Sequence, residues 1–358
     1  MLRRTQMNIS YANQTKKDLL NSIFEESKRV INEYINILWN KKNFHSKFID
    51  FKIDTWLSAR MQQCLGKQSL EIVKSQRKKK HKSKPNFNKD TIELDGRFID
   101  IQFDLTKEFD CFIKLSSIGN KISLKLPSKK HKHFNGFVED EWKMKNSCKL
   151  RKRNNKYFID LYFEKETPEI KTEGKEIGLD CGYKKLLISS ENQIYDCGLE
   201  NVYEKISRKK QRSCAFNKAL IERNNKINES VNKINLTDVK TIVVEDLKNV
   251  KKNSKGKIRK EFNNKLQRWS YPKVLNKLHL LCEREGINFV KVNPSFTSQT
   301  CSQCGFIHKE NRKNESFKCL NCGYETDADY NASVNILQRA VYSRSSKETD
   351  LDELYIFH

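Results

Sequence analysis

Four cysteines near the C-terminus form two close pairs whose spacing is typical of a metal site. Two residues separate Cys301 from Cys304, two separate Cys319 from Cys322, and a glycine follows each pair. Each pair puts two thiolates on one tight turn, and four thiolates fill the tetrahedral shell of Zn²⁺ without leaving a position for water. The spacing therefore predicts a structural zinc site.

Two disulfides are the alternative interpretation of these cysteines. The chain has 11 cysteines, an odd number, the other seven are scattered, and no secretory signal opens the sequence. These features favour a reducing compartment, where closely paired cysteines are expected to bind metal. His308 lies between the pairs and could replace a thiolate, but four cysteines already complete the shell.

Three carboxylates occupy positions from which they could act together. Asp180 and Glu245 each end an apolar, strand-like stretch, and Asp329 precedes a helical pattern that begins near residue 330. Carboxylates in an apolar framework are costly unless a cation neutralises them. If the fold brings the three together, they could bind two Mg²⁺ or Mn²⁺ ions, about 4 Å apart, and hydrolyse a phosphodiester.

Each carboxylate also has a purely structural interpretation. Asp180 could be a turn residue beside Gly182. Glu245 could begin a helix, whose dipole favours acids at that end. Asp329, or Asp327, could simply cap the helix that follows.

Composition points to a polyanionic partner. The 358 residues include 70 Lys and Arg against 45 Asp and Glu, so that the formal net charge is +25. Such an excess predicts contact with nucleic acid or an anionic membrane. No apolar run approaches the roughly 20 residues needed to cross a bilayer, so we expect a soluble protein. The basic residues are spread along the chain, which favours a nucleic acid lying in a long channel.

The N-terminal half changes pattern several times. The elements predicted there are a strand over 7–11, helices over 16–73, a polybasic run over 74–89, strands over 91–163 and a polar linker over 164–174. Asn13 or Thr15 could cap the first helix.

The C-terminal half reads as mixed α/β. Its predicted strands are Glu176–Asp180, Lys185–Ser189, Thr241–Glu245 and Asn288–Val292. A polar helical stretch over 202–234 separates the second strand from the third. A basic connection over 248–260 precedes a long helix that contains Trp269 and Tyr271, which could stack on bases but more simply pack in the core.

The C-terminal half resembles the TnpB family of transposon-encoded, RNA-guided nucleases, relatives of the miniature type V CRISPR effectors. The resemblance rests on five motifs in order between residues 175 and 340: GLDCGYKKLLIS, IVVEDL, NPSFTSQTCSQCG, FKCLNCG and TDADYNASVNIL. It implies a RuvC-like nuclease domain of RNase H fold, in which Asp180, Glu245 and Asp329 bind two divalent metals. Asp329 is chosen over Asp327 because the family's aspartate stands two residues before an asparagine, here Asn331.

The resemblance also implies an α+β multidomain architecture. The expected parts are a wedge-like β-barrel over 1–15 and 86–165, a helical recognition domain over 16–85, a linker over 166–174, a nuclease domain over 175–341 with a zinc knuckle over 297–325, and an acidic tail over 342–358. The barrel and the helical domain would hold a guide RNA and read a short target-adjacent motif in double-stranded DNA. A monomer in the prokaryotic cytoplasm, associated with the nucleoid, is expected.

Several basic residues are candidates for contacts with phosphates. The resemblance places Arg312 near a family arginine that meets substrate phosphate. The other candidates are Arg77, Lys78, Lys79, Lys80, Lys82, Lys84, Lys129 and Lys130. A basic run of this kind can also be a solvated, mobile loop.

RNA-guided cleavage of DNA is the function that the resemblance predicts, with base pairing supplying the specificity and with 3′-hydroxyl and 5′-phosphate products. Two alternatives stay open: a guided DNA-binding regulator that does not cleave, and a DNA transposase, which would join DNA and carry no RNA. A CRISPR effector would differ from a TnpB protein mainly in the origin of its guide.

Overall fold

A computed structural model of the chain shows two compact units, Met1–Glu166 and Thr167–His358. The structure describes residues 1–41, 49, 51–103, 108–117, 119, 122–138, 141–248, 250–253 and 259–345. Most of the predicted acidic tail, residues 346–358, lies outside these described residues. Each unit has its own hydrophobic core and is described separately.

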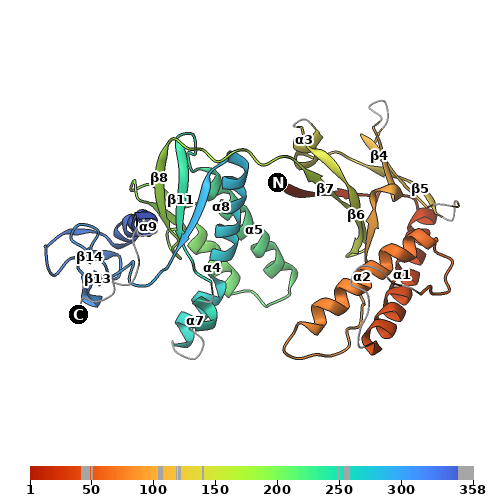
Figure 1. Ribbon diagram of the computed structural model, residues 1–358, viewed down its shortest axis with the longest axis horizontal. Helices are drawn as coiled ribbons and strands as arrows, with labels where there is room; N and C mark the ends of the chain where they lie inside the picture. Colours follow the sequence, from red (N-terminus) through yellow and green to blue (C-terminus); the bar gives the residue numbers. More distant parts are fainter. Residues whose placement is uncertain are drawn as a thin grey trace. The chain divides into compact units, whose positions relative to one another are not determined.

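The first unit contains two antiparallel sheets (Figure 1). A four-stranded sheet has the order β1-β7-β6-β2, with β1 Leu2–Asn8, β2 Thr91–Asp95, β6 Lys143–Arg153 and β7 Lys156–Glu164. A three-stranded sheet has the order β3-β4-β5, with β3 Ile99–Phe103, β4 Cys111–Ser116 and β5 Ser123–Ser128. The 3₁₀ turn Gly96–Phe98 precedes β3, and the short helix α3, Lys132–Val138, follows β5. The two sheets contribute to one core, and closure into the predicted barrel remains a proposal.

Two helices are inserted between β1 and β2. Helix α1 spans Gln14–Asn40 and begins at Asn13, whose side chain accepts a hydrogen bond from the amide of Lys16. This confirms one of the two predicted caps. Helix α2 spans Ala59–Arg77 and begins at Ser58, which caps it in the same way. Apolar residues at helical spacing bury one face of each helix, as amphipathic helices require.

The second unit is built on a five-stranded sheet. Its order is β10-β9-β8-β11-β12, with β8 Lys175–Asp180, β9 Leu187–Ser189, β10 Ile194–Tyr195, β11 Val239–Glu245 and β12 Asn288–Val292. Strands β8, β11 and β12 are parallel, whereas β9 and β10 are antiparallel additions at one side. The run of valines and isoleucine in β11 is buried on both faces, which is typical of a central parallel strand.

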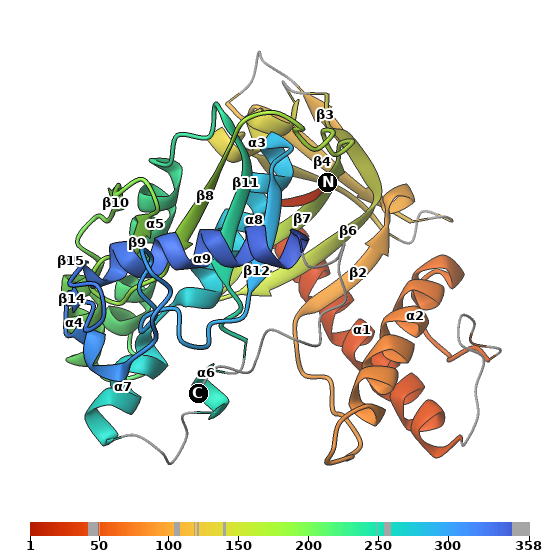
Figure 2. The same cartoon turned by 60° about the vertical axis from the view of Figure 1, so that its left-hand side comes forward.

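Helices cover both faces of this sheet (Figure 1). One face packs against α4 Leu199–Ser207, α5 Cys214–Asn232 and α8 Tyr271–Glu285. The other face packs against α9, Ala328–Ser345, and Figure 2 shows α9 lying across β8, β11 and β12. Two short helices, α6 Val250–Asn253 and α7 Lys260–Arg268, precede α8.

Two of the predicted helices are each divided in the structure. The stretch 202–234 is broken between α4 and α5, where residues 208–213 form turns and Arg212 has a φ of 68°. The prediction of one long helix containing Trp269 and Tyr271 is also wrong, because α7 ends at Arg268 and α8 begins at Tyr271. Pro272 stands in the first turn of α8, where its missing amide costs nothing, and this favours a new helix start.

A small three-stranded sheet lies between β12 and α9. Its strands are β13 Arg312–Lys313, β14 Ser316–Lys318 and β15 Glu325–Asp327, and the 3₁₀ turn Lys309–Asn311 precedes them. Residues 297–325, called the cysteine knuckle below, include most of this sheet and the four paired cysteines. Among the described residues, no helix is long and apolar enough to cross a membrane.

Candidate functional site

Two neighbouring parallel strands bring Asp180 and Glu245 to the same edge of the sheet. The register pairs Leu179 of β8 with Val244 of β11, so that the next residue on each strand is an acid. Parallel strands have the same direction, and their carboxyl ends therefore meet at one edge. The two predicted strand ends are correct to the residue.

Helix α9 brings the third carboxylate, Asp329, to this edge. The helix packs closely on β8 at Gly178, and Asp329 lies in its first turn. The neighbouring acid, Asp327, has a different role, since its Oδ1 accepts hydrogen bonds from the amides of Asp329 and Tyr330 at 3.0 and 3.1 Å. Asp327 therefore caps the helix, and the Nζ of Lys185 lies 2.6 Å from its Oδ2.

Asp180 lies in the electrostatic field of the other two carboxylates. Although Asp180 remains partly exposed as a residue, burial of its carboxyl group, together with the charges of Glu245 and Asp329, raises its pKa to about 8. Burial also raises the pKa of Glu245, and a hydrogen bond from the hydroxyl of Thr297 opposes this rise. Such a set is unfavourable as three free anions and therefore favours a bound cation.

One cation lies directly on this carboxylate set. The guanidinium of Arg312 in β13 donates to Oδ1 of Asp329 at 2.7 Å, and this side chain is 30% exposed. Both residues line a pocket of about 600 Å³ that also contains Asp180 and Glu245. The structure thus brings the four residues singled out by sequence to one pocket.

The rest of the pocket wall contains both basic and apolar side chains. Lys184 and Lys185 line it beside the carboxylates, and Phe262, Leu266 and Trp269 form an apolar part of the lining. The indole of Trp269 donates to the carbonyl of Gly182 at 2.9 Å, and Tyr271 is only 7% exposed. Core packing is therefore the observed role of Tyr271, whereas Trp269 combines packing with a place in the pocket wall.

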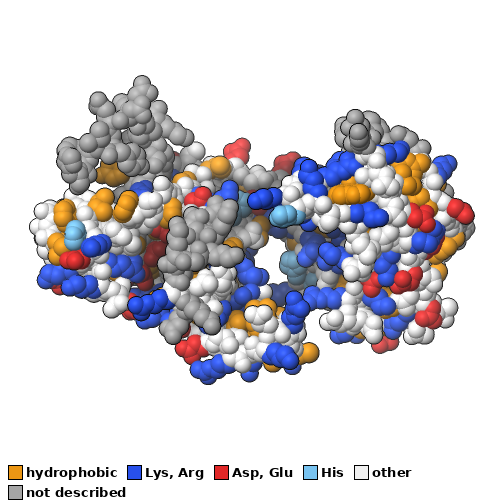
Figure 3. All heavy atoms as spheres, turned by 90° about the horizontal axis from the view of Figure 1, so that it is seen from below, with side chains coloured by type: hydrophobic (Ala, Val, Ile, Leu, Met, Phe, Trp, Pro, Cys, Tyr) orange, Lys and Arg blue, Asp and Glu red, His pale blue; other side chains and the backbone are white. Residues whose placement is uncertain are grey.

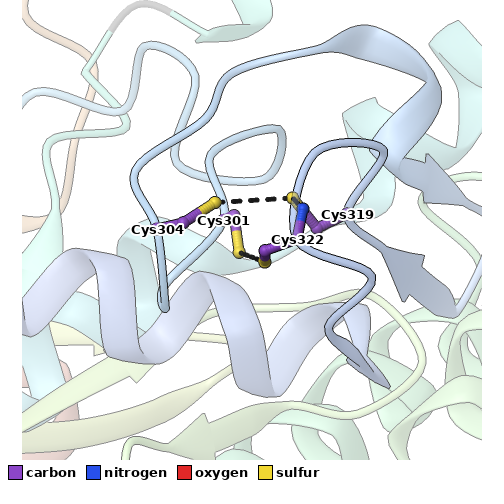
Figure 4. Close-up of side chains that lie close together, drawn as sticks. All are labelled: Cys301, Cys304, Cys319 and Cys322. Carbon is purple, nitrogen blue, oxygen red and sulfur yellow. Dashed lines mark hydrogen bonds between the residues drawn. The ribbon is translucent and has the colours of Figure 1, made fainter.

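The four paired cysteines converge on one point (Figure 4). Their sulfur atoms all lie within 4.8 Å of one another, close enough for all four to bind one metal ion. Gly305 and Gly323 follow the pairs with φ values of 76° and 75°, in the left-handed region that glycine adopts readily. The ring of His308 has other partners: it accepts a hydrogen bond from the amide of Glu310 and stacks on the ring of Phe306.

A buried asparagine joins the two halves of the knuckle. The side chain of Asn311, which is 1% exposed, donates to the carbonyl of Gln299 at 3.0 Å. Its Oδ1 accepts from the amide of Leu320 at 3.0 Å, next to the second cysteine pair. The knuckle is therefore held by hydrogen bonds as well as by its cysteines.

The predicted basic candidates of the first unit have three kinds of surroundings. Arg77 is structural, since its guanidinium donates to the carbonyls of Leu38, Trp39 and Lys41 at the end of α1. The exposed lysines are Lys78, Lys79, Lys80, Lys82, Lys84 and Lys129. Lys130 is half-buried, with its Nζ 4.7 Å from the centre of the Phe103 ring. Basic side chains are spread widely over the visible surface (Figure 3).

Sequence reasoning did not identify Thr297 and Asn335. Thr297 contacts Glu245, and Asn335 contacts the loop that carries Thr297. The only signal was their place inside the motifs NPSFTSQTC and DADYNASVN, where a threonine in a turn and a polar residue in a helix have many ordinary roles.

Comparisons with known proteins find relatives for part of this chain. The family model described as Cas12f1-like, TNB domain matches residues 271–336. The CRISPR-associated endodeoxyribonuclease Cas12f1 of Sulfoacidibacillus thermotolerans is 43% identical over 97 residues, which are 27% of this chain and 21% of that protein. The TnpB-like protein MJ0751 of Methanocaldococcus jannaschii is 31% identical over 99 residues, 28% of this chain and 35% of that protein.

A longer match and a solved structure extend the comparison. The putative RNA-guided DNA endonuclease InsQ of Escherichia coli is 28% identical over 222 residues, covering 51% of this chain and 53% of that protein. The aligned parts of these three relatives are all below two thirds of their length. A Cas12f1–sgRNA–target DNA complex matches with a TM-score of 0.58 at 15% identity, covering 90% of this chain and 83% of that one.

The structural match shows a multidomain α+β fold of the Cas12f1 type. Its sequence identity is low, so that it bears on the fold alone. The sequence matches concentrate on the part of the chain that contains α8, the cysteine knuckle and α9. Together with the ordered motifs, they support a TnpB-family protein.

Proposed function

We propose that this chain is an RNA-guided DNA endonuclease whose active site consists of Asp180, Glu245 and Asp329. The observation that carries the proposal is the meeting of these carboxylates and Arg312 at one pocket. The names of the relatives, an endodeoxyribonuclease and a putative RNA-guided DNA endonuclease, support it. The second unit is then a RuvC-like domain of RNase H fold, whose central strands β8 and β11 each end in a catalytic acid.

The carboxylate set suits two Mg²⁺ or Mn²⁺ ions. Carboxylate oxygens are the ligands that these hard cations prefer. Burial and the charges of Glu245 and Asp329 raise the pKa of Asp180 even beside Arg312, so further positive charge would be accommodated there. Asp180, Glu245 and Asp329 would hold the ions. When bound, the ions supply positive charge for the phosphodiester and lower the pKa of a water ligand.

The side chains around the carboxylates fit a phosphate substrate. Arg312 donates to Asp329, its side chain is 30% exposed, and it lines the pocket, so its guanidinium can also meet a phosphate oxygen. Lys184 and Lys185 line the same pocket and add positive charge where the sugar-phosphate backbone of the DNA strand would lie. These cations orient the phosphodiester and offset its charge against that of the acids.

The four cysteines of the knuckle suit a structural Zn²⁺. Four thiolates leave no coordination position for a substrate or a water, so this ion would take no part in cleavage. Its role would be to fix the loops that carry Arg312 and lead into α9.

Guide RNA and target DNA are the proposed partners. A net charge of +25 suits a chain that binds two nucleic acids, and the solved neighbour is a complex with sgRNA and target DNA. Base pairing with the guide would supply the sequence specificity, and the first unit would contact the guide and the target-adjacent motif. Exposed lysines from Lys78 to Lys84, together with Lys129, are candidates for phosphate contacts, and the protein would act as a monomer.

Substitution of Asp180 tests the active site. Asp180→Ala should abolish cleavage of a guide-matched DNA while the complex still binds guide and target, because the change removes a metal ligand. Asp246→Asn is the matched control, since Asp246 neighbours Glu245 but is exposed. Equal cleavage by Asp180→Ala and the parent protein would show that the active site lies elsewhere.

Sequencing the RNA that copurifies with the chain, expressed with its native flanking DNA, tests the guide. One enriched, structured RNA with a variable end supports guided cleavage. Its source, a transposon end or a CRISPR array, then distinguishes a TnpB protein from a CRISPR effector. Heterogeneous RNA, or none, on a folded protein would favour a transposase or an unguided nuclease.

A further inference from the structure

Thr297 fixes the position of one of the three carboxylates. It lies in the loop between β12 and the first cysteine pair and is 2% exposed. Its hydroxyl lies 2.5 Å from Oε1 of Glu245, as donor to the carboxylate, and 3.0 Å from the carbonyl oxygen of Pro294. A glutamate has three rotatable side-chain bonds, and a buried hydroxyl donor selects one arrangement among them.

The loop that carries Thr297 is itself held by two buried asparagines of α9. Nδ2 of Asn335, 3% exposed, donates to the carbonyls of Thr297 and Thr300 at 2.9 and 2.7 Å. Nδ2 of Asn331, 0% exposed, donates to the carbonyl of Thr300 at 2.8 Å, and its Oδ1 accepts from the amide of Ser302 at 3.0 Å. These bonds clamp residues 297–302 onto one side of α9.

The clamped segment spans the boundary between the two candidate metal sites. Cys301, a member of the cysteine cluster, lies between the clamped residues Thr300 and Ser302. Four residues earlier in the chain, Thr297 reaches Glu245. The helix that provides both asparagines also carries Asp329 in its first turn.

The backbone of the residue before Thr297 has an unusual conformation. Phe296, directly before Thr297, has a φ of 62°, which is unfavourable for a bulky side chain, and this side chain is 57% exposed. The carbonyl of Phe296 accepts from the amides of Gln299 and Thr300 at 2.9 and 3.0 Å. Such a backbone conformation persists only where the surrounding structure determines it, and here the neighbouring contacts are those of Thr297.

We infer that Thr297 is a positioning residue for Glu245, and that Asn331 and Asn335 couple the cysteine knuckle to the carboxylate metal site. The inference rests on the proposed function, because it assigns Glu245 to a metal. Hydrogen-bond partners of metal ligands orient those ligands, and their loss commonly weakens metal binding by about 10- to 100-fold. A disturbance of the knuckle would reach Glu245 through the clamped segment 297–302.

Binding of Mn²⁺ to the full-length protein tests the role of Thr297. Thr297→Val keeps the shape of the side chain and removes the hydroxyl, so Mn²⁺ affinity, measured by electron paramagnetic resonance, should fall about 10-fold or more. Thr297→Ser keeps the hydroxyl and should restore the parent affinity to within about 3-fold. Thr241→Val, a change at a buried threonine of the same strand as Glu245, is the matched control and should leave the affinity unchanged.

The outcomes separate this inference from the proposed function. If the parent protein shows no Mn²⁺ binding that Asp180→Asn removes, the carboxylate site itself is wrong. If that binding is present and Thr297→Val binds Mn²⁺ as tightly as the parent, only the positioning role is refuted. A fall in thermal stability without a change in Mn²⁺ affinity would likewise show that Thr297 is merely structural.

A double-mutant cycle tests the clamp. Asn335→Ala should retain the four cysteine ligands but weaken Mn²⁺ binding, and adding Thr297→Val should weaken it little further, because both changes release the same carboxylate. If the loss of Mn²⁺ affinity in the double variant equals the product of the two single losses, the coupling would be overturned. If Asn335→Ala does not fold, Gln338→Ala replaces it, since Nε2 of this partly exposed residue donates to the carbonyl of Ser302 at 3.1 Å.

Discussion

Gly178 of β8 lies against Ser333 of α9 with no space for a side chain between them. A Cβ on Gly178 would be 2.2 Å from the carbonyl oxygen of Ser333 and 2.9 Å from the amide nitrogen of Leu337. Because those atoms belong to the backbone of α9, the helix as a whole would have to move. This contact sets the distance between the strand that ends in Asp180 and the helix that carries Asp329.

Gly178→Ala should therefore impair the site from a position outside it. The displaced helix would separate Asp329 from Asp180, and we expect at least a 10-fold loss of cleavage together with a stability loss of about 1–3 kcal/mol, as for overpacked cores. Gly136→Ala in α3 is the control, since a Cβ there meets nothing within 4 Å. Unimpaired cleavage by Gly178→Ala would mean that α9 can shift without consequence for the acids.

The raised pKa of Asp180 predicts a specific dependence of stability on pH. In the metal-free protein the folded-state pKa of about 8 exceeds the value near 4 of an unfolded aspartate, so the folded state binds the proton more tightly. The resulting stabilisation is fully present below about pH 4 and is lost as pH rises through about 8. Asp180→Asn has no such dependence, and its advantage in unfolding free energy over the parent should grow between pH 5 and pH 8.

Urea denaturation at several pH values, without added divalent ions, measures this difference. Mg²⁺ should then stabilise the parent at pH 8 and leave Asp180→Asn nearly unchanged, because a bound cation offsets the burial and the carboxylate repulsion that raise the pKa. Parallel pH profiles for the two proteins would show that the pKa of Asp180 is ordinary.

The cysteine cluster predicts one zinc ion per chain. Cys319→Ser removes a buried member of the cluster and should lower both the zinc content, measured by mass spectrometry, and the melting temperature. Cys214→Ser changes an exposed cysteine in the first turn of α5 and should alter neither. Retention of a full equivalent of zinc by Cys319→Ser would remove this cysteine from the ligand set.

The parts of the fold that depend on local pattern were predictable from the sequence. The ends of β8 and β11 follow from apolar runs that stop at an acid, and β12 was predicted with its observed bounds, Asn288–Val292. Helix breaks were harder to predict, because residues 208–213 keep a polar, helix-compatible composition and the break depends on how α4 and α5 pack.

Contacts that depend on distant segments could not be predicted in this way. The bond between Thr297 and Glu245 joins residues 52 positions apart, and no periodicity signals it. Asn311 and Asn335 similarly have polar side chains whose burial depends on the complete knuckle. The family resemblance supplied the three acids as an ordered set, which their spacing alone would not have done.

Arg77 illustrates how a charge run can conceal a structural residue, and it yields a final prediction. Its guanidinium donates to the carbonyls of Leu38, Trp39 and Lys41 at 3.0, 3.1 and 2.7 Å, at the end of α1, where the last carbonyls of a helix lack donors from the helix itself. Arg77→Ala should destabilise the first unit by about 1–2 kcal/mol, because it removes these bonds and the contact with the Trp39 ring.

Lys80→Ala provides the contrast, since Lys80 is exposed in the same run. It should leave stability unchanged and, if the run lies along a phosphate backbone, weaken nucleic-acid binding with a salt dependence reduced by about one charge. Denaturation curves and binding titrations at several salt concentrations separate the two roles. Stability equal to the parent in Arg77→Ala would contradict the structural role, and an unchanged salt slope in Lys80→Ala would exclude that lysine from the nucleic-acid interface.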